Sequence, residues 1–288
     1  MAARPLLWLL PVALVLGTVY VIPVADVVRL SFSDATLLRP AENYGLSGYA
    51  AMLEARDLGV VLRNTLVFTV ASVLGLQLAG LCVALLVARG DRRGLRGMTA
   101  LRTIVLAAWV VPGVANGIIW QTLFSEAPFG AINSTLALIG LPRVAWLSDP
   151  DMAMLSAVLA NVWQGTAFSM VVFYAARRAI DPRLYEAAEV DGARPLARFV
   201  FITLPQLKGA ILVNTVLVTI QTLNTFDSIL ALTGGGPGRA TEVLSLHIFN
   251  RVFYNYDLGG GSVLALVLVA ISTVLTLLYI ALLGRGRQ

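Results

Sequence analysis

Long apolar stretches separated by short polar segments are the dominant pattern along this chain. Each stretch is long enough to cross about 30 Å of hydrocarbon at about 1.5 Å per helical residue. Backbone polar groups in lipid must be paired within the chain, so the pattern predicts membrane-spanning helices. We expect six of them, near residues 6–30, 60–88, 99–124, 152–176, 209–232 and 262–283. The predicted fold is therefore an all-α membrane protein, with a single membrane domain over residues 1–288.

Composition agrees with a membrane protein. The chain is 58% hydrophobic and 13% charged, whereas soluble domains are about 25% charged. The first apolar stretch is longer than the core of a signal peptide and lacks a small-residue cleavage site, so we expect it to remain as a spanning helix.

The basic residues are distributed unevenly between the two sides of this predicted bundle. Cytoplasmic loops of membrane proteins carry an excess of Lys and Arg. On this basis both termini and the segment 177–208 are expected to be cytoplasmic. That side would carry 14 of the 21 basic residues: Arg4, Arg89, Arg92, Arg93, Arg96, Arg102, Arg177, Arg178, Arg183, Arg194, Arg198, Lys208, Arg285 and Arg287. The positive charge therefore indicates membrane topology, and no nucleic-acid partner is expected.

Cysteine, histidine and lysine each occur only once in the chain, which disfavours several kinds of chemistry. Cys82 is the only cysteine and His247 the only histidine, so no internal disulfide and no histidine metal cluster are expected. The only lysine, Lys208, precedes Gly209, whereas a phosphate-binding P-loop requires Gly-Lys-Ser/Thr. The chain is therefore expected not to be an enzyme, with no catalytic residue, no metal site and no bound cofactor of its own.

The segment 177–208 is polar and basic between two apolar stretches, and it predicts a helical hairpin. Asp181 can cap a helix that begins at Pro182. Gly192 permits a reversal of the backbone, Pro195 can begin a second helix, and Pro205 should end it. Such a hairpin could dock on a soluble partner. An amphipathic linker lying on the bilayer surface is the alternative.

Polar side chains also recur inside the apolar stretches, where they are costly and usually face a bundle interior or a cavity. Asn116, Gln164 and Gln221 each fall near the middle of a predicted span. Amides and aromatic rings are suited to a neutral polyhydroxylated ligand. No Lys or Arg lies at that depth, as an anionic substrate would require. Amides that only hold helices together are the alternative interpretation.

Other polar and aromatic residues accompany these three amides. Asn161, Gln164, Gly165 and Phe168 share one helical face, and Gln121 and Trp120 follow Asn116 in the third stretch. Gln221, Thr222, Asn224 and Asp227 lie within two turns of the fifth. Asp227 lies nearer the outer end of its stretch, so we expect a structural or gating role for Asp227 and its neighbour Asn224.

Specific motifs resemble one transport family. Residues 186–193 read Glu-Ala-Ala-Glu-Val-Asp-Gly-Ala, followed after eight residues by Ile-Thr-Leu-Pro at 202–205. This resembles the cytoplasmic coupling loop, or EAA loop, of the membrane subunits of bacterial ATP-driven uptake systems. Residues 224–227, Asn-Thr-Phe-Asp, and 232–237, Leu-Thr-Gly-Gly-Gly-Pro, are similar to the carbohydrate branch, of the maltose and glycerol-3-phosphate type.

The resemblance implies a fold and a function. It implies the type I ABC importer permease fold with cytoplasmic coupling helices, and a permease that forms half of a translocation path by alternating access. The implied partners are a second homologous permease subunit, an ATPase dimer that binds ATP and Mg²⁺, an extracytoplasmic solute-binding protein, membrane lipid, and a mono- to oligosaccharide. The implied location is the bacterial cytoplasmic (inner) membrane, with several spans.

The resemblance also assigns residues to two sites. The implied ATPase-coupling residues are Glu186, Ala187, Ala188, Asp191 and Gly192. The implied substrate-binding residues are Asn116, Asn161, Gln164, Gly165, Phe168, Val218, Gln221 and Thr222. Gln164, Val218, Gln221 and Thr222 differ from the maltose pattern, which leaves the identity of the sugar open.

Three other functions remain to be compared with a sugar importer. The same architecture could carry a phosphorylated or non-sugar solute. A secondary transporter or channel would need ionisable residues along the path, where Asp227 is the only candidate. A structural scaffold would leave the coupling-loop motif and the amides unexplained.

Overall fold

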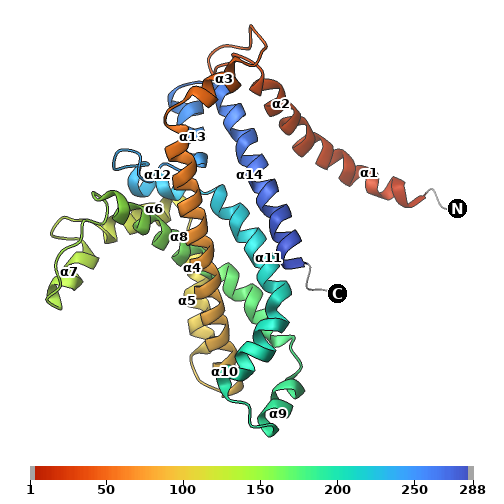
Figure 1. The fold of residues 1–288 in the computed structure, drawn as a ribbon, viewed down its shortest axis with the longest axis vertical. Coiled ribbons are helices and arrows are strands. Elements are labelled where there is room, and N and C mark those ends of the chain that lie inside the picture. The colour runs from red at the N-terminus through yellow and green to blue at the C-terminus, as the bar shows by residue number, and fades with distance from the viewer. Residues whose placement is uncertain (1–3, 285–288) are drawn as a thin grey trace. The chain divides into compact units, whose positions relative to one another are not determined.

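A computed structural model describes the backbone of residues 4–284 and the side chains of residues 8–282. The side chain of Arg4, together with Arg285 and Arg287, lies outside the described residues. The elements in chain order are α1 (Arg4–Leu16), the π turn η1 (Gly17–Val21), α2 (Ile22–Ser31), α3 (Ser47–Glu54), α4 (Leu58–Arg92), α5 (Met98–Val110), α6 (Gly113–Leu123), α7 (Ala131–Leu138), α8 (Pro150–Arg178), α9 (Pro182–Val190), α10 (Pro195–Arg198), the π turn η2 (Phe199–Thr203), α11 (Leu204–Leu223), α12 (Asp227–Thr233), α13 (Leu244–Phe249), the π turn η3 (Asn250–Tyr254) and α14 (Leu258–Gly284) (Figure 1).

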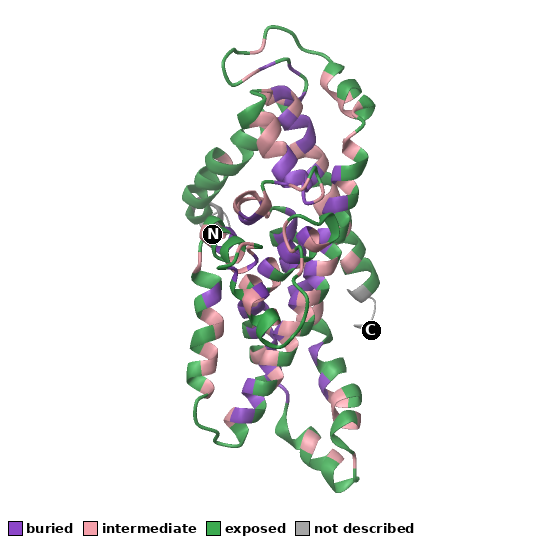
Figure 2. Ribbon diagram, turned by 90° about the vertical axis from the view of Figure 1, so that its left-hand side faces the viewer, coloured by how far each residue is buried: buried purple, intermediate pink, exposed green. Residues whose placement is uncertain are grey.

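The prediction of an all-α membrane protein is confirmed. Within the described part of the chain, β-structure is limited to two isolated bridges. Among the described residues, five helices are long and apolar enough to cross a membrane, and the pair α5 and α6 gives a sixth if it is counted as one span. The first apolar segment, Trp8–Ser31, has no buried residue in its most apolar window, and Figure 2 shows the N-terminal helix as exposed. A helix that is apolar on all sides needs lipid or protein around it.

The third predicted span is wrong as a straight helix. The stretch expected at 99–124 divides into α5 and α6, which are bent by 106° relative to each other. Val111 is extended and Pro112 stands at the N-cap of α6. Proline lacks an N–H and disfavours the helical conformation of the residue before it, so the helix breaks at this pair.

The fifth predicted span is also wrong in its bounds. It was expected at 209–232, but α11 ends at Leu223 and α12 is a separate short helix. The glycine run 234–236 therefore ends α12, through Gly234 in the left-handed conformation at φ +63°, and not the spanning helix. Asn224 and Asp227 consequently lie at and beyond the end of the span.

Pro205 does not end the second helix of the hairpin, contrary to prediction. The helix runs without a break from Pro195 to Leu223, because the π turn η2 lies directly before Leu204 and Pro205. Proline leaves the carbonyl four residues earlier without its helical partner and crowds it, and a π turn widens the helix locally. The same arrangement recurs in the first segment, where η1 precedes Ile22 and Pro23.

The chain divides into two compact units, which are described separately. One contains Met1–Gly59 and His247–Ile271. Within it, the loop after α2 folds on the side chain of Asp34, which accepts hydrogen bonds from the backbone N–H groups of Glu42 and Asn43 at 2.9 and 3.0 Å. These bonds, that of Asn43 first, lower the pKa of Asp34 to about 2. The loop is also joined to the start of α14, because Gly259 donates to the carbonyl of Ala35 at 2.9 Å.

The second unit contains Val60–Leu246 and Ser272–Gln288, and close packing of small residues shapes it. Helix α6 carries Gly113 and Gly117 on one face, one turn apart. A Cβ at Gly117 would lie 2.5 Å from the carbonyl oxygen of Ser228, and one at Gly113 would collide with the carboxylate of Asp227. Small residues at this spacing let two membrane helices approach closely. The backbone of α6 therefore packs directly on α12, as Figure 1 shows.

Candidate functional site

The predicted helical hairpin is present between α8 and α11. Asp181 is the N-cap of α9, where its carboxylate accepts a hydrogen bond from the N–H of Arg183 at 2.9 Å, and Pro182 opens the helix. At the other end, Ala193 donates to Ala188 at 2.8 Å and Gly192 to Glu189 at 3.0 Å. These two bonds form a Schellman motif, which requires a left-handed residue after the helix.

Gly192 supplies this left-handed residue, with a φ of +73°. A Cβ at this position would have nothing within 4 Å. The requirement for glycine therefore comes from the backbone conformation and not from crowding.

Side-chain bonds hold the hairpin together. Arg198 of α10 pairs with Glu189 of α9 at 3.0 Å, and the hydroxyl of Tyr185 lies 2.8 Å from that of Thr203 in η2. Of the predicted coupling residues, Glu186, Ala187, Asp191 and Gly192 are exposed and Ala188 is half-buried. The structure therefore brings all five together on one short, braced hairpin with a free outer surface.

Two of the three predicted mid-span amides, Asn116 and Gln164, meet at the break between α5 and α6. Because the break leaves the carbonyl of Val111 without a helical partner, the side chain of Gln164 in α8 donates to it at 2.6 Å. Asn116, which is fully buried, donates to Gln164 at 3.2 Å and to the hydroxyl of Ser228 in α12 at 3.0 Å. Asn116 and Gln164 thus join three elements, and they hold helices together in the way the alternative interpretation requires.

The remaining polar residues of the predicted set lie on α8 and α11. Asn161 is half-buried and donates to the hydroxyl of Thr222 at 3.5 Å, and Thr222 itself is buried. Gln221 is exposed, and the described residues include no hydrogen-bond partner for its side-chain amide. Gln221 is therefore the predicted amide with the greatest freedom to bind a ligand.

The apolar members of the predicted set contribute to packing in this conformation. Val218 is buried with Val73 and Leu76 of α4, and Phe168 packs against this group. Gly165 also faces α4, because a Cβ there would lie 2.6 Å from the Leu76 side chain. A large residue at Gly165 would thus collide with α4 before it reached a ligand.

Asn224 and Asp227 lie at the junction of α11 and α12. The side chain of Asn224 donates to the carbonyl of Ile220 at 2.7 Å, and the carboxylate of Asp227 accepts from the N–H of Ser228 at 2.9 Å. Asp227 also lies against Gly113, the first residue of α6. A negative charge is favourable at the N-terminal end of a helix. Asp227 therefore links the two short helices.

A second polar cluster was missed from the sequence. Asn214 of α11 is fully buried and donates to Gln77 of α4 at 2.8 Å and to Ser169 of α8 at 3.0 Å. Gln77 in turn donates to Thr215 and to the carbonyl of Ile211. The sequence contained a signal for this cluster, since Gln77 and Asn214 are amides inside long apolar helices.

Comparison with known proteins gives a consistent result. The profile of a family described as "Binding-protein-dependent transport system inner membrane component" matches residues 80–287. The trehalose/maltose transport system permease protein MalF of Thermococcus litoralis is 35% identical over 284 residues, which cover 98% of this chain and 94% of that protein. The sulfoquinovosyl glycerol transport system permease protein SmoG of Agrobacterium fabrum is 34% identical over 276 residues, which cover 95% and 88%.

A solved structure has the same fold. It is a chain of a bacterial alginate ABC transporter in complex with an alginate pentasaccharide-bound periplasmic protein, with a TM-score of 0.83, 22% identity, and coverage of 98% of this chain and 94% of that one. At this identity the similarity establishes the fold of the chain.

The hydrogen bonds of Asn116 give a testable prediction on stability. Asn116→Ala would leave the Gln164 carbonyl oxygen and the Ser228 hydroxyl without this partner, at a cost of about 1–3 kcal/mol. We expect a lower thermal unfolding temperature of the purified protein in detergent, measured by tryptophan fluorescence. The matched control is Gln221→Ala, which removes an exposed amide and should leave the temperature unchanged. Equal temperatures for the two variants would contradict the structural role of Asn116.

Proposed function

Because this chain belongs to the family of binding-protein-dependent transport system inner membrane components, we propose that it is the permease subunit of an ATP-driven sugar importer. The observation that supports this most is the combination of an exposed coupling hairpin with polar residues on the same two helices that enter and leave it. The two relatives named above are described as transport permeases for a sugar or a glycoside. The match covers nearly the whole of this chain and most of each relative. Multi-pass insertion in the inner membrane follows from the family and from the apolar helices.

The translocation path is proposed to form between this chain and a second homologous permease subunit. The exposed amide of Gln221 and the half-buried amide of Asn161 would supply the polar contacts of this half of the path. Asn116 and Gln164 would position the broken helix beside them. The substrate would be a mono- to oligosaccharide or glycoside, whose hydroxyl groups match amide donors and acceptors.

The energy source is proposed to be a separate ATPase dimer that binds ATP and Mg²⁺. The hairpin α9–α10 would dock on it through the exposed residues Glu186, Ala187, Asp191 and Gly192. Helix α8 enters the hairpin, and α10 continues into α11. A displacement of the hairpin would therefore be transmitted to both helices that carry Asn161 and Gln221, and would alternate access to the path. An extracytoplasmic binding protein would deliver the sugar.

The proposed path predicts a change in affinity for the sugar. Gln221→Ala would remove a hydrogen bond to substrate and should raise the half-saturation constant of uptake about tenfold, since each lost bond costs about 1.4 kcal/mol in a desolvated site. The measurement is sugar uptake by reconstituted importer complexes, normalised to the amount of complex, across a panel of neutral and phosphorylated sugars. An unchanged constant for every transported solute would contradict the role of Gln221. Uptake of phosphorylated solutes alone would favour the alternative substrate class.

The proposed coupling role predicts a loss of communication with the ATPase. Gly192→Val would place a β-branched residue at a φ of +73°, a conformation that costs at least about 1–2 kcal/mol in L-residues. We expect transport and sugar-stimulated ATP hydrolysis to fall several-fold while membrane insertion is retained. Gly192→Asn is the control, because asparagine tolerates the left-handed conformation. Normal stimulated hydrolysis in the valine variant would refute the assignment.

The proposed orientation has the hairpin and both termini in the cytoplasm. Two cysteines are introduced, by Arg194→Cys in the hairpin and by Leu138→Cys in α7. The native Leu138 is 87% exposed. The two cysteines should lie on opposite sides of the membrane. Cys82 is exposed, so the experiment needs a Cys82→Ala background. A membrane-impermeant maleimide added to intact cells should label position 138 only. Labelling of position 194 as well would invalidate the orientation.

A further inference from the structure

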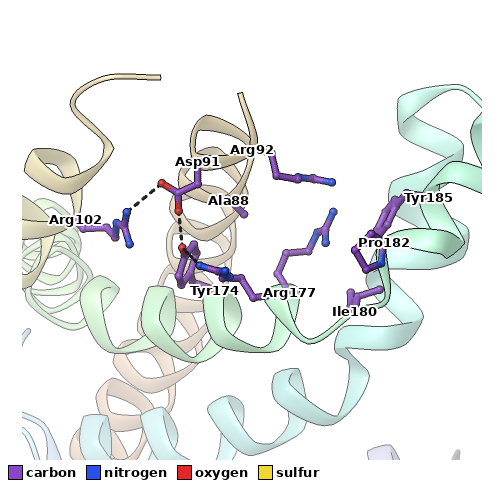
Figure 3. A pocket seen from close by; sticks show the side chains of 10 residues that line it. Ala88, Asp91, Arg92, Arg102, Tyr174, Arg177, Ile180, Pro182 and Tyr185 are labelled. Atoms are coloured by element: carbon purple, nitrogen blue, oxygen red, sulfur yellow. Dashed lines mark hydrogen bonds and ion pairs between the residues drawn. The ribbon is translucent and has the colours of Figure 1, made fainter. Parts of the chain in front are cut away.

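A pocket of about 460 Å³ lies where α4, α5 and α8 meet the coupling helix α9. Four of the residues that line it are arginines, namely Arg92, Arg102, Arg177 and Arg178, and the only carboxylate among them is Asp91. Figure 3 shows Arg102 beside Asp91, and Arg92 and Arg177 on the side of the pocket near Tyr185. Four guanidinium groups facing one carboxylate leave the pocket with an excess of three positive charges.

The single carboxylate is already occupied. Asp91 pairs with Arg102 at 3.0 Å and accepts a hydrogen bond from the hydroxyl of Tyr174 at 2.5 Å. Arg178 donates to the same hydroxyl at 3.3 Å. On this side of the pocket, Asp91 therefore balances the charge of Arg102. Arg178 is connected to Asp91 only through the hydroxyl of Tyr174.

Arg177 has no such compensation. Its side chain is 7% exposed, and its guanidinium lies over the ring of Tyr185, 4.2 Å from the centroid. No carboxylate or carbonyl oxygen pairs with it among the residues that the structure describes. Arg92 approaches the same ring at 5.7 Å, so two cations contact one aromatic ring. A cation–π contact offsets only part of the cost of burying a charge.

The pocket is therefore suited to an anion with several oxygen atoms. Guanidinium groups bind phosphate through paired, charge-assisted hydrogen bonds. Apolar side chains, Ala88 and Ile180 among them, form the remaining wall. The position of the pocket, at the basic ends of α4 and α8, is where apolar helices leave the hydrocarbon. Basic pockets between helices at this level are suited to anionic lipid headgroups.

We propose that this pocket binds the phosphate group of an anionic phospholipid headgroup. Tyr185 belongs to α9, and its ring contacts the guanidinium groups of Arg92 in α4 and Arg177 in α8. A phosphate bound to these two guanidinium groups would therefore fasten the coupling helix to the membrane bundle. A carboxylate from a docked protein is the less favoured occupant, because the exposed surface of α9 carries acidic side chains such as Glu186, which would repel it. The proposal concerns a site distinct from the sugar path and does not rest on the identity of the transported solute.

The test is retention of lipid by the assembled importer complex, measured by native mass spectrometry after delipidation and addition of phosphatidylglycerol or phosphatidylcholine. Arg177→Gln and Arg92→Gln remove charge from the pocket. Arg93→Gln removes an exposed charge from the same end of α4 without touching the pocket, and is the matched control. We expect phosphatidylglycerol to bind about five- to tenfold more weakly to both pocket variants, with binding to the control unchanged and phosphatidylcholine weak throughout. Arg92 is exposed, so its variant keeps the test valid if Arg177→Gln misfolds.

A second arm uses inorganic phosphate and separates the sources of the anion. If phosphatidylglycerol binding is equal in all four proteins while inorganic phosphate binding is lost in the pocket variants, the site takes a free phosphate and the headgroup assignment is overturned. If neither anion discriminates the variants from the control, the proposal is overturned altogether. Loss of the ATPase subunit from the pocket variants with unchanged anion binding would likewise overturn it, in favour of a protein contact.

Discussion

The hydrogen bond from the side chain of Gln164 to the carbonyl of Val111 is the interaction on which the central part of the structure depends. A helix cannot break inside an apolar environment unless its released backbone groups find partners. Pro112 creates the break, and Gln164 pairs with the carbonyl that it frees. Asn116 then connects the amide of Gln164 to Ser228, so that α6, α8 and α12 are positioned by one set of polar contacts. The same residues that suggest a polar path are thus required to hold its wall in place.

This double use explains why the sequence predicted some features of the site and not others. The hairpin was predictable because its signals are local: Asp181 and Pro182 begin a helix and Gly192 reverses the chain. The proximity of Asn116 to Gln164 was also predictable, from amides at a similar distance from the helix ends. The different roles of the amides were not predictable, because they depend on the 106° bend between α5 and α6. A hydropathy average over neighbouring residues does not detect such a bend. Gly165 and Val218 illustrate the same limit, since only the position of Leu76 in α4 shows that they pack against another helix.

Two prolines account for errors of opposite kinds in the predicted helices, because Pro112 breaks a helix that was expected to continue and Pro205 lies within one that was expected to end. Pro112 follows an extended residue and separates two helices. Pro205 follows a π turn and remains inside a helix of 29 residues. Sequence rules treat both prolines as helix ends, because the widening of one helical turn has no reliable sequence signal. The continuity at Pro205 matters for the proposed transmission, since α10 of the hairpin and the residues around Gln221 then belong to one continuous helix.

The π turn η2 also has a geometrical consequence for this element. A π turn contains one residue more than the hydrogen-bonding pattern of an α-helix accommodates, and each residue rotates an α-helix by about 100°. The five residues Phe199–Thr203 therefore set the angular phase between the coupling hairpin and everything that follows it. In this phase Gln221 is exposed and Val218 is buried. Two relatives that differ by a single residue in this turn would present different faces of α11 to the path, even if their hairpins and their amides were identical.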